Sequence, residues 1–131
     1  MRYLLDTDAF IALLGDPDLL SADYRRLLVS PESQFVLSPA SIWEMAIKVR
    51  LGKLSFHGGL TLDDLTTTGR IGQGIRLLPI KQSHLRAIAR LPKVAGRGDP
   101  FDLLIIAQSL TENLPVLTTD RYFRDYGVRV V

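Results

Sequence analysis

Short apolar runs alternate with amphipathic segments along the chain. The length and composition of the apolar runs predict buried strands at residues 3–5, 34–37, 75–78, 115–117 and 127–131. The helical spacing of apolar positions predicts helices at residues 9–14, 21–29, 39–51, 62–71, 82–91 and 100–112. Strands separated by helices predict an α/β fold in which helices cover both faces of a mainly parallel sheet.

Two of the predicted helices have a strong start signal. Ser38 precedes Pro39, and Asp99 precedes Pro100. Ser and Asp are good N-caps, and Pro is favoured at the first helical position. This signal makes Asp99 the N-cap and Asp102 the third residue of a helix that is otherwise apolar.

The overall composition is that of a globular protein. The chain has 131 residues, of which 47% are hydrophobic and 23% charged, so we predict a single domain over residues 1–131. Apolar runs such as residues 103–107 are too short to cross a bilayer, and the acidic start at residues 1–8 lacks the order of a signal peptide. We therefore expect a cytoplasmic protein without a membrane partner.

Cysteine is absent from the sequence. This absence excludes disulfide scaffolds, cysteine zinc sites, iron–sulfur clusters and thiol nucleophiles. A bound metal ion would therefore have ligands that are oxygen atoms or one of the two histidines, His57 and His84.

Five acidic residues fall where predicted strands end or predicted helices begin: Asp6, Glu44, Asp99, Asp102 and Asp120. Sites in parallel α/β proteins form at the carboxyl ends of the strands, so we expect these side chains to cluster. The net charge is only +2, but the sixteen basic residues face nine acidic ones when the five are set aside, a balance of +7. This distribution predicts an acidic pocket in a basic protein.

Each of these acids also has a purely structural interpretation. Asp6 and Asp99 could serve only as caps of the helices that follow them. Glu44 could complete a capping box with Ser41, or it could face solvent. Asp120 could cap a short turn. The functional hypothesis depends on the convergence of all five acids from separate parts of the chain.

Clustered carboxylates favour a divalent cation. They repel one another and do not all stay ionised unless a cation neutralises them. Oxygen ligands without cysteine indicate Mg²⁺ or Mn²⁺ in place of zinc. Such ions polarise phosphoryl oxygens and activate water, so the pattern predicts a phosphodiester as the substrate.

Several segments together resemble a known family. They are Leu-Leu-Asp-Thr at residues 4–7, Ser-Pro-Ala-Ser-Ile-Trp-Glu-Met-Ala-Ile-Lys at 38–48, Gly-Lys-Leu at 52–54, Asp-Pro-Phe-Asp-Leu-Leu-Ile-Ile-Ala-Gln at 99–108 and Leu-Thr-Thr-Asp at 117–120. In this order and spacing the chain resembles PIN-domain ribonucleases, specifically the VapC-like toxins of bacterial toxin–antitoxin systems. The resemblance implies a PIN fold, a three-layer sandwich with a central, mainly parallel sheet flanked by helices. It also implies RNA cleavage that depends on Mg²⁺ or Mn²⁺.

The resemblance assigns roles to individual residues. The family's acidic quartet corresponds to Asp6, Glu44, Asp102 and Asp120, which are the expected catalytic and metal-binding residues. Asp6 and Asp102 are the expected direct ligands, and Asp99 is an additional acid that either binds metal or caps the helix. Thr118 and Thr119 are expected to support the site.

An acidic pocket repels RNA phosphates, so flanking cations must hold the substrate. The nearest candidates in sequence to Glu44, Asp99 and Asp120 are Lys48, Arg97 and Arg121. We predict a metal-dependent endoribonuclease toxin with an antitoxin partner, and we expect a homodimer. Two alternatives stay open: a catalytically silent PIN-fold interaction module, and a receiver-like phosphoacceptor domain.

Overall fold

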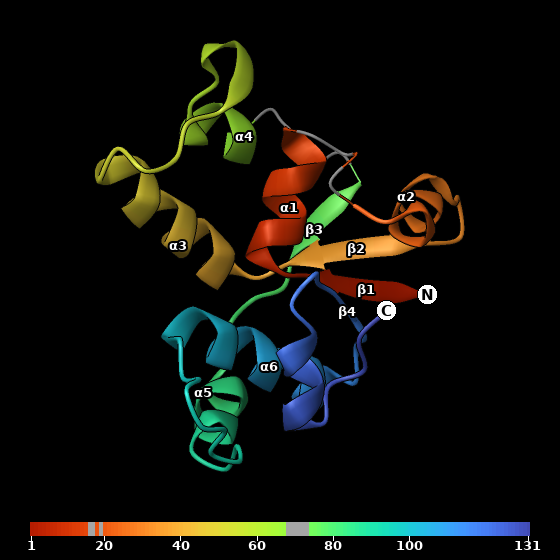
Figure 1. The fold of residues 1–131 in the computed structure, drawn as a ribbon, viewed down its shortest axis with the longest axis vertical. Coiled ribbons are helices and arrows are strands. Elements are labelled where there is room, and N and C mark those ends of the chain that lie inside the picture. The colour runs from red at the N-terminus through yellow and green to blue at the C-terminus, as the bar shows by residue number, and fades with distance from the viewer. Residues whose placement is uncertain (16–17, 19, 68–73) are drawn as a thin grey trace.

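A parallel β-sheet forms the centre of the molecule (Figure 1). The computed structural model describes residues 1–15, 18, 20–67 and 74–131, and the structural statements below concern these residues. The strands are β1 (Arg2–Leu5), β2 (Gln34–Leu37), β3 (Ile75–Leu77) and β4 (Val116–Leu117). Their order across the sheet is β3-β2-β1-β4, and each neighbouring pair is parallel.

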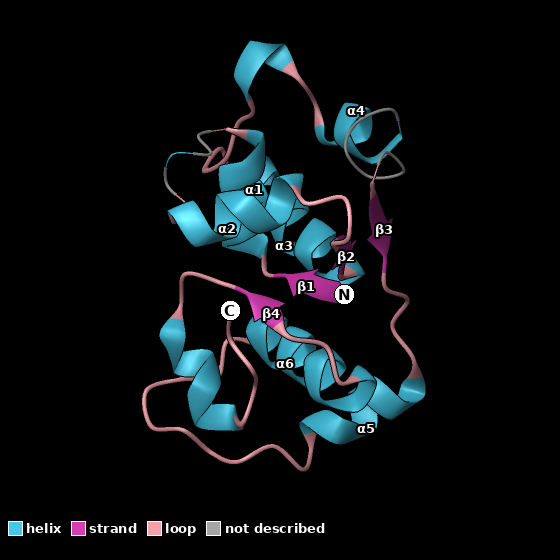
Figure 2. Cartoon of the chain, turned by 90° about the vertical axis from the view of Figure 1, so that its right-hand side faces the viewer, coloured by secondary structure: helices cyan, strands magenta, loops and turns pink. Residues whose placement is uncertain are grey.

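Helices cover both faces of the sheet (Figure 2). One layer contains α1 (Thr7–Leu14), α2 (Ala22–Val29), α3 (Pro39–Arg50) and α4 (Leu62–Thr67). The opposite layer contains α5 (Gln82–Ile88) and α6 (Pro100–Glu112). Short 3₁₀ segments lie between α3 and α4, at η2 (His57–Gly59), and after β4, at η3 (Arg121–Tyr126). The predicted three-layer α/β sandwich is therefore confirmed.

Alternate residues of each strand point to opposite layers, as the two-residue period of a strand requires. Leu4 and Val36 belong to the hydrophobic cluster on the α6 side, which includes Ile106. Their neighbours Leu5 and Leu37 belong to the other cluster, with Phe10 of α1. Residues 3–5, 35–37 and 116–117 of β1, β2 and β4 are buried, which explains why they are short continuous apolar runs in the sequence, whereas the edge strand β3 buries only Ile75.

The predicted strand at residues 127–131 is wrong. This segment forms only an isolated parallel bridge, between Val130 and Val116. The reason is that its partner β4 contains only two residues. Both backbone hydrogen bonds of the bridge involve Val116, whose N–H donates to the Arg129 carbonyl and whose carbonyl accepts from the Val131 N–H.

Several helix bounds also differ from the predictions. The first helix begins at Thr7, before the predicted residue 9, because Asp6 caps it. The helix predicted at residues 82–91 ends at Ile88 and continues as a turn. The predicted helix at 62–71 agrees with α4 as far as Thr67, and residues 68–71 lie outside the described residues.

The sheet topology places three strand ends side by side. Leu5 pairs with Leu37 of β2 and with Leu117 of β4, so the residues that follow these three strands lie at the same edge. The chain builds the sheet from β1 outward through β2 and β3, and then places β4 on the other side of β1. Such a switch in strand order is where α/β proteins form their binding sites.

A buried histidine fastens α5 to α6, the helix that carries Asp99 and Asp102 at its start. His84 is fully buried, and its Nδ1 accepts a hydrogen bond of 3.0 Å from the Lys81 backbone N–H. The ring proton therefore lies on Nε2, which donates to Glu112 Oε1 at 2.8 Å. This pairing joins the start of α5 to the end of α6.

We predict that His84→Ala destabilises the protein by about 2–4 kcal/mol, because it leaves a cavity and removes the partners of Lys81 and Glu112. Glu112→Gln is the matched control, since it keeps an oxygen acceptor for His84 and should cost less. Urea denaturation followed by circular dichroism measures both. Equal stability of His84→Ala and the unmodified protein would contradict the proposed role of this contact.

Candidate active site

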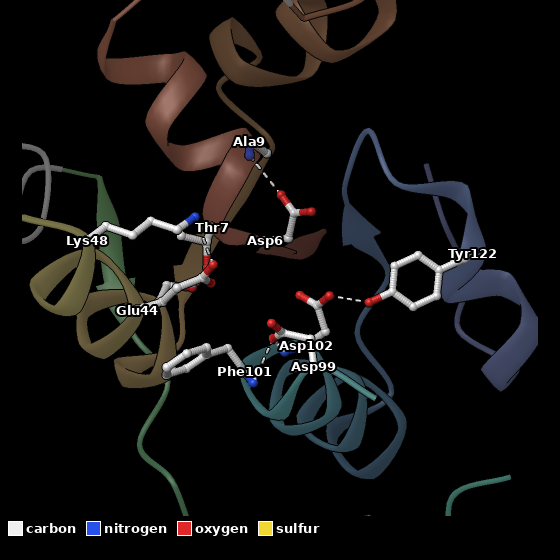
Figure 3. A network of polar contacts seen from close by, with 10 residues as sticks. Asp6, Thr7, Ala9, Glu44, Lys48, Asp99, Phe101, Asp102 and Tyr122 are labelled. Carbon is white, nitrogen blue, oxygen red and sulfur yellow. Dashed lines mark hydrogen bonds and ion pairs between the residues drawn. The ribbon is translucent and has the colours of Figure 1, made fainter. Parts of the chain in front are cut away.

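The structure brings the five predicted acidic residues together. They line a pocket of about 200 Å³ at the carboxyl edge of the sheet, here called the acidic pocket. Its lining consists of Asp6, Thr7, Asp8, Glu44, Asp99, Asp102 and Asp120. Figure 3 shows Asp6, Glu44, Asp99 and Asp102 approaching one another from β1, α3 and α6.

Asp6 connects three elements. Its side chain is 4% exposed, its Oδ1 accepts from the Ala9 N–H at 2.7 Å as the N-cap of α1, and its Oδ2 accepts from the Thr118 hydroxyl after β4. The capping interpretation is therefore correct, and it does not exclude a role in the pocket. A carboxylate has spare lone pairs when it caps a helix.

Asp102 is held from the opposite side. The Tyr122 hydroxyl donates a hydrogen bond to Asp102 Oδ2 (Figure 3). The Arg97 guanidinium carbon lies 4.2 Å from the centroid of the Tyr122 ring, in a cation–π contact. Arg97 thus contacts the tyrosine that orients Asp102.

Glu44 has neither of the structural roles considered for it. Ser38, not Ser41, caps α3, since Ser38 Oγ accepts from the Ala40 N–H at 3.0 Å. The Glu44 side chain is only 15% exposed, so it does not simply face solvent. Its Oε2 lies 3.1 Å from Lys48 Nζ, while its Oε1 is buried without a hydrogen-bond partner among the described residues. A buried acceptor without a partner indicates that the pocket has room for a donor or a cation there.

Asp99 and Asp120 complete the pocket at the starts of two helical segments. Asp99 Oδ1 caps α6 by accepting from the N–H groups of Phe101 and Asp102, at 2.9 and 3.0 Å. Asp120 precedes η3 and makes no side-chain cap there; its backbone N–H instead donates to Thr118 Oγ1 at 2.9 Å. The capping alternative is therefore correct for Asp99 and wrong for Asp120.

Burial and mutual repulsion disfavour ionisation of two of these acids. Burial is the main cause that raises the pKa of Asp6 to about 7, and the nearby Asp8 and Asp102 add to the effect. Burial likewise raises the pKa of Asp102 to about 6, with contributions from Asp99, Glu44 and Asp120. Hydrogen bonds from Thr118 and Tyr122 act in the opposite direction but are outweighed.

Of the two threonines expected to support the site, Thr118 contacts the pocket acids and Thr119 lies in a different pocket. Thr118 bridges Asp6 and the backbone of Asp120, and its carbonyl accepts a hydrogen bond of 2.5 Å from Tyr24. Thr119 is exposed and lines a larger neighbouring pocket of about 610 Å³, together with Arg121 and Arg124.

Comparison with known proteins identifies the family. The family model for the PIN domain matches residues 3–128. The chain belongs to the PIN domain family. The receiver-like alternative is therefore wrong, because the PIN model matches nearly the whole sequence.

Solved structures with the same fold include toxin–antitoxin proteins. A chain of VapBC2 from Rickettsia felis, bound to a promoter DNA fragment, is 16% identical with a TM-score of 0.69, over 100% of this chain and 98% of that chain. FitAcB from Neisseria gonorrhoeae is 21% identical with a TM-score of 0.63, over 99% and 96%. The Mycobacterium tuberculosis toxin VapC20, which cleaves the sarcin–ricin loop, is 17% identical with a TM-score of 0.66, over 100% and 98%. No curated protein has a significantly similar sequence.

The acidic pocket of this PIN domain offers donors suited to a hard divalent cation. Its lining provides carboxylate and hydroxyl oxygens, and Glu44 Oε1, which has no hydrogen-bond partner among the described residues, is the oxygen most available as a metal ligand. Among the described residues, no three acidic or histidine side chains already form a complete ligand set. Asp6 and Asp102 hold hydrogen bonds from Thr118 and Tyr122, but each carboxylate keeps further lone pairs for an ion.

Three residues of the site were missed by sequence reasoning. Asp8 lies in the first turn of α1, and its spacing from Asp6 was a usable signal. Thr7, directly after Asp6, lines the pocket, and its hydroxyl donates to Ser41 Oγ at 2.9 Å. Tyr122 gave no sequence signal, because its hydroxyl meets Asp102 only as a result of how η3 is placed in the fold.

His84 does not line the acidic pocket, because its ring makes the contact between α5 and α6. In the described part of the chain, every helix is too short or too polar to cross a lipid bilayer.

We predict that the metal-free protein loses stability as the pH rises from about 4 to 7. In this window folded Asp6, with a pKa of about 7, keeps a proton that the unfolded chain, with a pKa of 3.8, releases. The folded state therefore binds more protons, so stability falls with rising pH. Asp6→Asn keeps the cap acceptor and should flatten this dependence, with a higher melting temperature than the unmodified protein at pH 7.5.

Thermal denaturation in a chelator at pH 5 and pH 7.5 tests this prediction. Asp125→Asn is the control, because Asp125 is exposed and outside the acidic pocket. The prediction fails if the pH dependence of Asp6→Asn equals that of the unmodified protein.

Proposed function

We propose that this PIN domain is a metal-dependent endoribonuclease, the toxin of a toxin–antitoxin pair. The observation that carries the proposal is the convergence of Asp6, Glu44, Asp99, Asp102 and Asp120 on one pocket. A purely structural use of these acids does not require them to meet, because caps and surface carboxylates are most stable apart. Hydrolysis of RNA in the cytoplasm is the corresponding activity.

The solved structures share the fold on which this proposal builds. VapC20 is a toxin that cleaves the sarcin–ricin loop, and VapBC2 was solved with promoter DNA. These likenesses lie below 25% identity and show the fold alone, so the activity is proposed from the pocket together with the family.

Asp6 and Asp102 are proposed as the direct ligands of Mg²⁺ or Mn²⁺, with Glu44, Asp99 and Asp120 around them. A bound ion would polarise the phosphoryl group and favour deprotonation of water. Thr118 orients Asp6 and Tyr122 orients Asp102, so both carboxylates are fixed before substrate arrives. Fixed groups need little rearrangement during the reaction.

Glu44 is suited to handle the proton of the attacking water. Its Oε1 is buried in the pocket and has no partner among the described residues. Lys48 holds the other oxygen at 3.1 Å and so fixes the side chain. The hydrogen bond and charge of Glu44 outweigh burial and raise the pKa of Lys48, which keeps this lysine positive.

The cations proposed to bind RNA have different positions. Arg97 lies on the ring of Tyr122, whose hydroxyl contacts Asp102, and of the three cations it is linked most directly to a pocket acid without being paired to one. Lys48 is engaged by Glu44, and Arg121 lines the neighbouring larger pocket. We therefore assign the closest RNA contact to Arg97 and a more distant one to Arg121.

Removing a proposed ligand should abolish cleavage without unfolding the protein. We predict that Asp6→Asn and Asp102→Asn each lower the rate of Mg²⁺- or Mn²⁺-dependent RNA cleavage by about 100-fold or more, since several kcal/mol of charge stabilisation is lost. Cleavage of labelled RNA with and without a chelator measures the effect, with circular dichroism to confirm folding.

Asp99→Asn is the matched comparison. Asn is also a good N-cap, so near-normal activity indicates a cap alone, and a loss as large as that of Asp102→Asn makes Asp99 a ligand. A folded Asp6→Asn protein that cleaves RNA at the normal rate would refute the proposed site. Metal binding without any cleavage by the unmodified protein would instead support the silent interaction module.

An antitoxin is the proposed protein partner. A disordered segment with one basic residue could neutralise the carboxylates of the acidic pocket, while its apolar residues cover exposed aliphatic side chains such as Ile47 of α3 and Leu51 just after it, 37% and 54% exposed. The homodimer predicted from the sequence stays a prediction.

We predict that antitoxin and RNA compete for this protein, because both need the acidic pocket. Antitoxin added to the Asp102→Asn protein bound to labelled RNA should release the RNA, as measured by fluorescence anisotropy. A stable ternary complex in which the affinity for RNA is unchanged would exclude the shared face.

A further inference from the structure

An aromatic pair joins the two helices, α3 and α6, that carry the pocket acids Glu44 and Asp102. Trp43 of α3 and Phe101 of α6 meet edge to face, with ring centroids 4.8 Å apart and an angle of 80° between the ring planes. Trp43 directly precedes Glu44, and Phe101 lies between the two pocket acids Asp99 and Asp102 in the sequence. Figure 3 shows the Phe101 ring between the helices that carry Glu44 and Asp102.

The pair is both fixed and accessible. Phe101 is anchored at the start of α6, where its N–H donates to Asp99 Oδ1 at 2.9 Å. Edge-to-face contact stabilises two aromatic rings while it covers only one of their four faces. Trp43 remains 56% exposed, so the indole offers surface to a ligand.

We propose that Trp43 and Phe101 form a stacking platform for an unpaired nucleobase of the RNA whose backbone enters the acidic pocket. This inference rests on the proposed function and specifies its substrate as single-stranded at the nucleotide beside the cleavage point. A base joined to a phosphate in the pocket lies within reach of rings attached next to the pocket acids. Every base has a flat face, so the platform binds bases with little sequence preference.

The aromatic platform would attract RNA, whereas the carboxylates of the acidic pocket repel it. Carboxylates repel the phosphodiester backbone, and Lys48, the lysine nearest to Trp43 along α3, is paired with Glu44. Stacking on an aromatic ring contributes affinity that does not depend on charge. Binding through the base therefore offsets repulsion of the backbone at the same place.

A protein side chain is the competing occupant. Ile47, one turn along α3 from Trp43, and Leu51, just past the end of α3, are also exposed, and a protein partner would cover all three positions. A stacked base uses only the aromatic residues at the pocket. Ile47→Ala is therefore the matched control, on the same helix face and one turn away from Trp43.

Trp43 is the only tryptophan of the chain, so its fluorescence reports on the platform alone. The experiment uses the Asp102→Asn protein, titrated with poly(A), with poly(U) and with an abasic ribose-phosphate polymer of equal length. We expect both RNAs to quench the fluorescence and the abasic polymer to leave it unchanged.

Variants in the same Asp102→Asn protein measure the contribution to affinity by anisotropy of labelled RNA. We expect Trp43→Ala to weaken RNA binding about 10-fold, Trp43→Phe to retain most of the affinity, and Ile47→Ala to have no effect. The slope of affinity against salt concentration should be the same with and without Trp43, because stacking releases no counterions.

The platform would be overturned by bound RNA without quenching, by equal losses of affinity for Trp43→Ala and Ile47→Ala, or by no RNA binding at all. A loss of antitoxin binding alone in Trp43→Ala would assign these rings to the protein partner and overturn it too. Failure of the unmodified protein to cleave RNA that quenches Trp43 would refute the nuclease and leave the platform standing.

Discussion

The burial of Asp6 is the constraint on which the arrangement of the site depends. A carboxylate that is 4% exposed needs hydrogen bonds, and Asp6 obtains them from the first turn of α1 and from Thr118 after β4. These contacts fix the ends of β1 and β4 relative to each other. The same burial raises the pKa of Asp6, so the site favours a proton or a cation on this side chain. The burial of Asp6 thus determines both how the strand ends are joined and which ions its side chain favours.

Much of the fold could be predicted because local signals and tertiary packing agree. The strand at residues 34–37 was predicted with its observed bounds, and both proline-marked helices begin where Ser38 and Asp99 cap them. The segment at residues 127–131 failed because its apolar residues serve packing: Val128 is buried in the α6-side cluster, and β4 is too short to pair with a full strand. Apolar composition does not distinguish a segment that pairs in a sheet from one that only packs against the core.

The acids of the site were predictable because topology alone brings strand ends and helix starts to one edge. Their supporting contacts were not, because they depend on where side chains of distant segments point. The Tyr122 hydroxyl meets Asp102 from a 3₁₀ segment, and Arg121, next to it in the sequence, faces a different pocket. Sequence proximity to Asp120 therefore did not reveal that Arg121 lines this other pocket, nor that Arg97 contacts the ring of Tyr122.

The short edge strands affect how this protein can assemble. The sheet ends on one side with the three residues of β3 and on the other with the two residues of β4, whose Val116 is already bridged to Val130. Such edges present few free backbone groups, which protects the protein from strand-to-strand aggregation. A partner segment has little to gain by adding a β-strand here. It would bind through helical or irregular contacts with the outer layers, and its affinity would depend on side chains more than on backbone pairing.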